Sequence, residues 1–457
     1  MSLHFTRRRA LQLGSAGTLG YLFGGSALSL GRVYGANDRI RVAGVGVGGK
    51  GFGDIEQAGL VMEVVALCDI DADRLDKRAA TWPSAKKFFD YRKLFDVMAK
   101  DIDAVTVSTA DHSHAPAAIR AMRAGKHVYV QKPLTHTVAE ARKMREVAAE
   151  NKVVTQMGNQ GSALNGLRRA VEIVQSGILG TVKEAHVWTN RPAHYWKQSP
   201  DIVGRPKESP AVPANVHWEE WIGPAPMRPY HRAYHPHDWR GYWDFGTGAL
   251  GDMACHTANM AFRALKLTAP TAVSAEAAEI NPETYPAWAH IQYQYSNCTL
   301  HWYEGKKDGQ RVLPPQDLLA KLLKPNEKLS DSGSILVGDK GVLFSPNDYG
   351  AQFRLTPDKD FEGVQMTRPE KSPEGTDKDH DPFMKKEWAA AIRAGKPEMA
   401  SSNFEIAGRL TEAMLLGNIA VRFAGQKLMW DAASLKFAGS DKATALVSKE
   451  YRKGWEI

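Results

Sequence analysis

The residues whose types and spacing most clearly predict a chemical role form a glycine-rich turn near the start of the chain. The sequence Val45-Gly46-Val47-Gly48-Gly49-Lys50-Gly51 follows an apolar run that begins at Ile40. Gly46 permits a sharp turn, Gly48 lets the backbone approach a pyrophosphate, and Gly51 lets a helix pack closely on a strand. Phosphates would then rest on the amides of a helix N-terminus. The pattern predicts a dinucleotide-binding turn.

An acidic residue follows this turn at the spacing that such a site requires. Asp69 ends a second apolar run, Val64 to Cys68, about twenty residues further on. A carboxylate at this place can accept hydrogen bonds from the adenosine ribose hydroxyls, and it would repel a 2′-phosphate. We therefore expect NAD as the cofactor, in preference to NADP.

Two further polar residues lie just beyond the carboxyl ends of predicted parallel strands. Thr109 comes after the run Ala104 to Ser108, and Lys132 comes after His127 to Val130 and before Pro133. Open α/β sheets bind their ligands at these strand ends. A partly desolvated lysine near a cationic nicotinamide loses its proton more easily, so Lys132 is a candidate acid or base. The alternative is a surface lysine before a proline.

A third candidate pair lies in the segment Gly246 to Asn259. Asp252 and His256 are four residues apart, so on a helix they share one face, where the carboxylate could orient the imidazole. This arrangement is typical of a base with its orienting acid. The alternative is a helix-capping aspartate and a histidine satisfied within the core.

The elements that must position these groups follow a βαβ rhythm from Arg39 to about Thr155. Strands are predicted at 40–45, 64–68, 104–108, 127–130 and 153–157, with a covering helix at 137–151. This rhythm predicts an α/β fold whose N-terminal part, residues 37–157, is a Rossmann dinucleotide-binding domain.

After Gly158 the pattern changes. Longer strand-like segments are predicted at 183–189, 272–279, 290–295, 299–303 and 335–343, with a hairpin turn at 338–341, a polar surface loop at 369–381 and closing helices at 383–394 and 404–423. Residues 158–457 are therefore predicted to form an α+β domain with a predominantly antiparallel open sheet.

An aromatic insert, residues 191–245, interrupts this second domain. The insert holds nine of the 24 prolines and, together with Trp188, six of the 12 tryptophans, which predicts an ordered loop region rather than regular structure. Flat aromatic faces pack on the C–H face of a sugar while imidazole and guanidinium groups bind its hydroxyls. We therefore assign substrate binding to Trp188, Arg191, Tyr195, Trp196, His237, Trp239 and Trp243.

The N-terminus indicates export. Arg7 and Arg8 lie in Thr6-Arg7-Arg8-Arg9-Ala10-Leu11, ahead of a mildly apolar stretch that ends at Leu30. Residues 1–36 are predicted to be a twin-arginine signal peptide, and the mature protein to be periplasmic or otherwise extracytoplasmic. Gly and Ser residues make the stretch a poor permanent membrane span, so we expect no stable span after processing, although a retained anchor is the alternative.

Composition argues against a nucleic-acid partner, a disulfide framework and a metal site. The net charge is +8, but Lys and Arg are scattered among acidic residues and no nucleic-acid-binding module is recognised, so we expect no nucleic-acid partner. Three widely spaced cysteines form no disulfide framework, which suits a protein folded before export. His231, His235 and His237 have no Cys or clear acidic ligand at motif spacing, so no metal site is expected.

Taken together, these motifs closely resemble the Gfo/Idh/MocA family, the group of glucose-fructose oxidoreductase and inositol dehydrogenase. The resemblance covers residues 39–457 and rests on the glycine turn with Asp69, on Thr109-x-x-His112-x-His114, on Lys132-Pro133 and on Asp252-x-x-x-His256. It implies that Lys132, Asp252 and His256 meet beside the nicotinamide. The predicted cofactor-binding residues are Gly46, Gly48, Gly51, Asp69, Thr109, His112, His114, Gln131 and Lys132.

The resemblance implies an NAD-dependent oxidoreductase that passes hydride between bound nicotinamide and a secondary alcohol of a sugar, glycoside or polyol. The same family contains glycosidases that oxidise a ring carbon, eliminate the aglycone and return the hydride. A non-catalytic binding protein is the other alternative, and family members often pair through the open sheet, so a homo-oligomer is expected. The chain departs from the family at Gln131, usually Glu, and at Asn259, often Asp.

Overall fold

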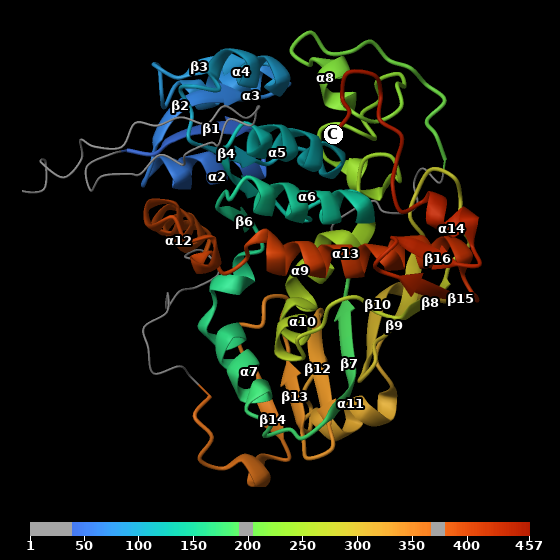
Figure 1. Cartoon of the computed structure of the whole chain (residues 1–457). Helices are drawn as coiled ribbons and strands as arrows, with labels where there is room; N and C mark the ends of the chain where they lie inside the picture. The colour runs from blue at the N-terminus through green and yellow to red at the C-terminus, as the bar shows by residue number, and fades with distance from the viewer. Residues whose placement is uncertain (1–38, 192–203, 367–379) are drawn as a thin grey trace, which may run out of the picture. The chain divides into compact units, whose positions relative to one another are not determined.

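The structure, a computed structural model, describes residues 39–191, 204–366 and 380–457. Within these residues the first part of the chain forms a six-stranded sheet in the order β3-β2-β1-β4-β5-β6, with every neighbouring pair parallel (Figure 1). Its strands are β1 (Arg41–Val45), β2 (Glu63–Cys68), β3 (Lys86–Phe88), β4 (Ala104–Val107), β5 (His127–Val130) and β6 (Thr155–Met157). The predicted Rossmann fold is confirmed, and the predicted signal residues lie outside the described chain.

Helices cover both faces of this sheet. They are α2 (Lys50–Gly59), α3 (Ala72–Ala79), α4 (Tyr91–Met98), α5 (His114–Arg123) and α6 (Val138–Glu150). One apolar core lies between the sheet and α4, α5 and α6, and another lies on the α2 face. Helix α6 begins at a capping box, in which the Thr137 side chain accepts from the Glu140 amide and the Glu140 carboxylate accepts from the Thr137 amide.

The second sheet is mixed. Its main path runs β14-β13-β12-β7-β10-β9-β8-β15-β16, and β7 and β10 form its parallel pair among the described strands. The strands are β7 (Val182–Thr189), β8 (Ala272–Ala277), β9 (Trp288–Gln294), β10 (Thr299–Lys307), β11 (Gln310–Arg311), β12 (Gly333–Gly338), β13 (Val342–Ser345), β14 (Arg354–Thr356), β15 (Lys427–Asp431) and β16 (Lys436–Ala438). The predicted, predominantly antiparallel sheet is confirmed.

One face of the second sheet carries the largest apolar core. The remaining helices are α7 (Asn165–Gln175), α8 (Trp218–Ile222), α9 (Gly248–Thr257), α10 (Asn259–Ala264), α11 (Gln316–Leu322), α12 (His380–Ala394), α13 (Phe404–Ala420) and α14 (Asp441–Ala445). Residues of α7, α9, α10 and α13 fill this core. Among the described residues, no helix is both long and apolar enough to cross a bilayer.

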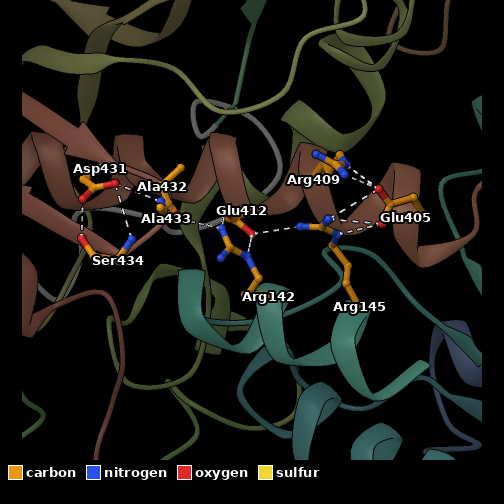
Figure 2. Close-up of polar contacts among 9 residues, drawn as sticks. All are labelled: Arg142, Arg145, Glu405, Arg409, Glu412, Asp431, Ala432, Ala433 and Ser434. Atoms are coloured by element: carbon orange, nitrogen blue, oxygen red, sulfur yellow. Dashed lines mark hydrogen bonds and ion pairs between the residues drawn. The ribbon is translucent and has the colours of Figure 1, made fainter. Parts of the chain in front are cut away.

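Helices from the end of the chain return to the first sheet. Trp388 of α12 packs in the core beside α2, and Phe404 of α13 packs in the core on the opposite face. Charged groups join α13 to α6: Arg142 binds the buried Glu412 through two nitrogens at 2.6 and 2.9 Å, and Arg145 contacts Glu405 and Glu412 (Figure 2). The C-terminal helices therefore help to build the domain of the first sheet.

The described part of the aromatic insert from 215 to 245, here called the cap, has an apolar core of its own. The core is formed by Val216, Trp218, Trp221, Ile222, Ala225, Ala233, Tyr234, Trp239, Tyr242 and Phe245. Trp218 stacks on Trp221 with ring centroids 4.6 Å apart. Most of the aromatic side chains of the cap thus pack against one another in this core.

Candidate active site

A cavity of about 490 Å³ lies along the carboxyl ends of the parallel strands. Its walls come from the glycine turn, from the ends of β2, β4 and β5, from the cap and from the last residues of the chain. Its lining residues include Gly46, Gly48, Lys50, Asp69, Thr109, Asp111, Gln131, Lys132, Trp221, His237, Trp239, Arg240 and Tyr349. This edge of an open α/β sheet is where ligands are expected.

The glycine turn has the geometry that its sequence predicts. Gly46 has a φ of +75°, a conformation that suits glycine. A Cβ on Gly51 would lie 1.8 Å from the carbonyl oxygen of Gly46, so only glycine lets α2 approach the turn this closely. Gly46 and Gly48 both line the cavity at the N-terminal end of α2. The turn therefore fits the pyrophosphate of a dinucleotide.

Asp69 follows β2 directly, lines the cavity and is buried. One carboxylate oxygen accepts from the amides of Val47 and Gly48, each at 2.8 Å, and the other accepts from the amide of Asp71 at 3.0 Å. Burial raises the pKa of Asp69, against these three amide hydrogen bonds. The carboxylate therefore ties the end of β2 to the glycine turn, at the place predicted for the ribose.

Lys132 meets Asp252 at the wall of the same cavity. Its amine donates to Asp252 Oδ1 at 2.8 Å, and the guanidinium of Arg240 lies 3.7 Å from the same oxygen. Lys132 and Arg240 line the cavity, whereas the Asp252 side chain lies buried behind them. The structure therefore brings together a lysine after β5 and an aspartate of α9, 120 residues apart in sequence.

His256 lies one turn beyond Asp252 on α9, as its spacing predicts, but with a different partner. Asp252 is paired with Lys132, and the Nδ1 of His256 is buried without a hydrogen-bond partner among the described residues. This corrects the predicted orientation of the imidazole by Asp252. Burial, assisted by Lys132, Lys50 and Arg191, holds the pKa of His256 well below its usual value, so the ring is neutral. It packs edge-on against Tyr349, which lines the cavity.

Asp111 is a cavity residue that our sequence reasoning did not select. Its Oδ2 accepts from the Thr247 amide at 3.1 Å and from the Thr247 hydroxyl at 2.8 Å. Burial raises the pKa of Asp111 to about 7, with Arg240 and Lys132 opposing and Asp252 reinforcing the shift. The available signal was an acid two residues after Thr109, at the same strand end.

The two histidines that follow Asp111 are placed differently from the prediction. His112 and His114 do not line the cavity, and each ring lies between two backbone carbonyls: Phe245 and Trp221 for His112, Pro133 and Thr109 for His114. Burial lowers the pKa of His112 to about 3 and of His114 to about 4. His112 therefore joins β4 to the cap. Thr109 and Gln131, by contrast, both line the cavity.

The predicted substrate residues separate into several places. His237 and Trp239 line the cavity. Trp188 is fully buried and stacks on Phe344 beneath α11, because its side of β7 faces that helix rather than the ligand site. Trp243 packs on Tyr285 and lines a separate cavity of about 280 Å³. Arg191 does not line the main cavity, and Tyr195 and Trp196 lie outside the described residues.

The cap is attached to the loop that follows Asp69. The His217 amide donates to the Ile70 carbonyl at 2.8 Å, the Ala72 amide donates to the Asn215 carbonyl at 2.8 Å, and the His217 ring stacks on Phe89 at 3.8 Å. The Asn215 side chain also donates to Asp71. Trp221 and Trp239 of the cap line the same cavity as the glycine turn.

Two family models match this chain, and together they cover more than half of it. Residues 39–159 match the oxidoreductase family's NAD-binding Rossmann fold, and residues 165–312 match its C-terminal alpha/beta domain. The chain belongs to the Gfo/Idh/MocA oxidoreductase family.

Curated relatives align with about a third of the chain. Inositol 2-dehydrogenase of Salmonella typhimurium is 34% identical over 130 residues, which is 27% of this chain and 37% of that protein. A glycosyl hydrolase family 109 protein of Shewanella putrefaciens is 30% identical over 154 residues, which is 31% of this chain and 33% of that protein. The chain thus spans about a third of the length of these curated relatives.

Solved structures share the fold over both domains. Aldose-aldose oxidoreductase of Caulobacter crescentus has a TM-score of 0.57 at 17% identity, over 86% of this chain and 100% of that one. An inositol dehydrogenase homologue of Azotobacter vinelandii, complexed with NADH and myo-inositol, has a TM-score of 0.58 at 16% identity, over 86% and 98% of the two chains. At these identities the likeness establishes the fold.

Proposed function

We propose that this protein is an exported, NAD-dependent oxidoreductase that passes hydride between the nicotinamide and a secondary alcohol of a sugar, glycoside or polyol. The observation that carries this proposal is the Lys132–Asp252 pair at the wall of the cavity that also contains the glycine turn and Asp69. A proton-transfer group and a dinucleotide site share one space.

Bound NAD supplies the hydride acceptor. Oxidation of an alcohol also releases the hydroxyl proton, which a positioned side chain must accept. Lys132 lines the cavity and is held by Asp252, and the neutral ring of His256 lies behind Tyr349 with an unused nitrogen. Lys132 is the proposed acid-base group, and His256, which does not itself line the cavity, is the proposed second proton acceptor.

Two features support a polyhydroxylated substrate. Arg240, His237 and Trp239 of the cap and Asp111 after β4 place donors, acceptors and an aromatic face in the same cavity. Such a mixed surface suits the hydroxyls and the C–H face of a sugar or cyclic polyol. The inositol dehydrogenase relatives, together with a levoglucosan dehydrogenase of the same fold, act on molecules of this kind by name.

The second candidate is a redox glycosidase, which the 30% identity to the glycosyl hydrolase family 109 protein favours. In that reaction a ring carbon is oxidised, the aglycone is eliminated, water adds, and the same hydride returns to the ring carbon. No net NADH forms. A cofactor enclosed beneath the cap suits such a closed cycle, because it needs no external supply.

The test is to purify the protein without added cofactor and identify bound nucleotide by mass spectrometry. Incubation with a panel of sugars, polyols and aryl glycosides follows. NADH formation or hydride exchange between two sugars supports the oxidoreductase, whereas aglycone release without net NADH supports the glycosidase. Absence of bound nucleotide, of NAD affinity and of turnover with every compound would leave a non-catalytic binding protein.

Export is proposed from Arg7 and Arg8, ahead of the apolar stretch. The twin-arginine route carries folded proteins, so a cofactor captured in the cytoplasm could travel with the enzyme. Replacement of both arginines with lysine should leave the folded protein in the cytoplasm with its nucleotide bound. Cell fractionation checks this, and normal export of the double variant would contradict the proposed route.

A further inference from the structure

A fully buried ion pair lies next to the cavity, in contact with residues that line it. The amine of Lys385, on α12, donates to Asp54 Oδ1, on α2, at 2.6 Å, and neither side chain is exposed. Removing two charges from water is costly, and a well-packed apolar pair often stabilises a fold equally well. The pair is therefore weak evidence of a purely stabilising role, and its other contacts decide what it does.

The second oxygen of Asp54 contacts residues that follow β4 and β5. Asp54 Oδ2 accepts from the Ser108 hydroxyl and from Gln131 Nε2, each at 2.8 Å. Ser108 follows β4 and Gln131 follows β5, and both line the cavity, whereas Asp54 and Lys385 do not. The ion pair thus contacts the site through these two neutral side chains and through Lys50, a cavity residue whose amine lies 3.6 Å from Asp54 Oδ1.

The amide of Gln131 can take only one orientation in this place. Its nitrogen faces a carboxylate that must accept, and its oxygen accepts from the Lys132 backbone amide at 3.2 Å. Gly158 closes the other side, where a Cβ would lie 2.6 Å from the same amide nitrogen. Gln131 therefore links Asp54 to the backbone of Lys132.

Asp54 carries its charge despite complete burial. Burial alone would raise the pKa of Asp54, but the ammonium groups of Lys385 and Lys50 outweigh it and hold the pKa below its usual value. Burial lowers the pKa of Lys385, against the attraction of Asp54 and Asp381. Its amine also lies 4.0 Å from the Tyr129 ring centroid. The charged carboxylate is what obliges Gln131 to present its nitrogen.

We propose that the Lys385–Asp54 pair positions Lys132: the charge on Asp54 fixes the Gln131 amide, which fixes the Lys132 backbone so that the lysine amine meets Asp252. Gln131, Asp54 and Lys385 are positioning residues and do not touch the reacting atoms. The inference rests on the proposed acid-base role of Lys132 for its effect on turnover. Its structural content, the orientation of Lys132, is measurable without any substrate.

If the ion pair only joined α12 to α2, its role would not depend on whether residue 131 donates or accepts the hydrogen bond with Asp54. Gln131→Glu tests this dependence, because it replaces the donating amide with a second carboxylate against Asp54 and changes the size of the side chain very little. Two carboxylates in contact share one proton and titrate as a pair. Below that ionisation the protonated Glu donates to Asp54 as Gln does, and above it the two charges repel. The variant therefore acquires a new pH dependence.

The matched variant is the exchange Asp54→Asn with Gln131→Glu. The Asn amide now donates to the Glu carboxylate, so the hydrogen bond returns with its direction reversed, and the formal charge equals that of the wild type. Glu412→Gln is the control for disturbing a buried ion pair elsewhere, because Glu412 joins α13 to α6 away from the cavity (Figure 2).

The substrate-free measurement is competitive acylation by acetic anhydride across pH, with the Lys132 peptide quantified by mass spectrometry. We expect the Lys132 profile of Gln131→Glu to match the wild type at low pH and to depart from it by roughly threefold or more as pH rises. Turnover should fall over the same range by roughly tenfold, within the hundredfold that a misplaced group can cost. The exchange variant and Glu412→Gln should keep the wild-type profile.

An unchanged Lys132 profile in folded Gln131→Glu overturns the positioning role. If that variant does not fold, the exchange variant alone decides: a wild-type profile supports the inference, and an altered profile overturns it. A pH-dependent labelling change without any measurable turnover in the wild type would uphold the positioning of Lys132 while contradicting the proposed function.

Discussion

The two walls of the cavity are built in different ways. The sheet wall presents backbone amides and strand-end side chains, such as Gly48, Asp69 and Lys132, on a regular parallel sheet. The cap wall presents Trp221 and Trp239, which belong to a separate apolar core. One wall carries the groups able to move protons and bind phosphate, and the other encloses them.

This contrast changes how the aromatic insert is interpreted. A loop rich in aromatic residues predicts a sugar site, yet most cap aromatics pack on one another, and the cap adjoins Asp69 and Phe89 at the ribose end of the cavity. We therefore propose that the described cap residues that line the cavity contact the cofactor as much as the substrate. The comparison predicts that sheet-wall variants change chemistry and that cap variants change cofactor exchange.

The largest effect is expected at the proposed acid-base groups, Lys132 on the sheet wall and His256 of α9. Lys132→Ala and His256→Ala should each reduce turnover by roughly a hundredfold, the usual contribution of a positioned acid or base. Cofactor should remain bound, as checked by mass spectrometry. Groups that act as a unit are not additive, so the double variant should lose little beyond the slower single variant.

Near-normal turnover in both single variants, with every active substrate, would remove these residues from the chemistry. Asp252→Asn is the graded comparison: it retains the geometry but removes the charge that pairs with Lys132, so its loss should be smaller. Steady-state kinetics at several pH values separate the three variants.

Asp111 should give the next largest effect, on stability. Burial raises its pKa to about 7 from an ordinary value of 3.8, so between about pH 4 and pH 7 the folded state holds a proton that the unfolded chain has lost. Its contribution to the free energy of unfolding therefore falls as pH rises. Asp111→Asn keeps an acceptor for Thr247 but cannot ionise. Its free energy of unfolding relative to the wild type should therefore increase by roughly 2 kcal/mol from pH 5 to pH 8. Denaturant unfolding at both pH values measures this, and a constant difference would contradict the shifted pKa.

Most of the fold could be predicted because its signals are local. Apolar runs define β1, β2, β4 and β5, and the capping box fixes the start of α6. Strand β3 was missed because Lys86 and Lys87 leave this edge strand without an apolar signature. The domain boundary predicted after residue 157 did not foresee that α12 and α13 pack against the nucleotide-binding half, because such contacts depend on tertiary structure.

The site was predictable where motif spacing implies a position, and unpredictable where a side chain's direction decides. Strand ends and glycine spacing located Asp69 and Lys132 on the cavity. The sequence does not say which side of β7 faces a ligand, so Trp188 was misplaced. The pairing of Asp54 with Lys385 spans 331 residues and carries no local signal.

Asp69 tests the ribose end of the sheet wall. Asp69→Ala should weaken NADH binding roughly tenfold, since a hydrogen bond to a charged group contributes about 1.5 kcal/mol or more. It should also relax discrimination against NADPH, because the carboxylate that would repel a 2′-phosphate is gone. Fluorescence titration with both nucleotides measures this. The matched control is Asp73→Ala, an exposed carboxylate that does not line the cavity, and unchanged affinities in Asp69→Ala would place the ribose elsewhere.

The smallest effect is expected at the attachment of the cap. His217→Ala removes the ring that stacks on Phe89, an interaction of about 0.5–1.5 kcal/mol, so the cap should open roughly threefold to tenfold more often. If nucleotide passes only through the open state, dissociation and association of NADH both become faster, and the Kd changes less than either rate. Stopped-flow displacement measures both rates, with the exposed cap residue Met227→Ala as control. Faster dissociation with unchanged association would instead mean that His217 supports the bound nucleotide, and unchanged rates would mean that the cap does not control exchange.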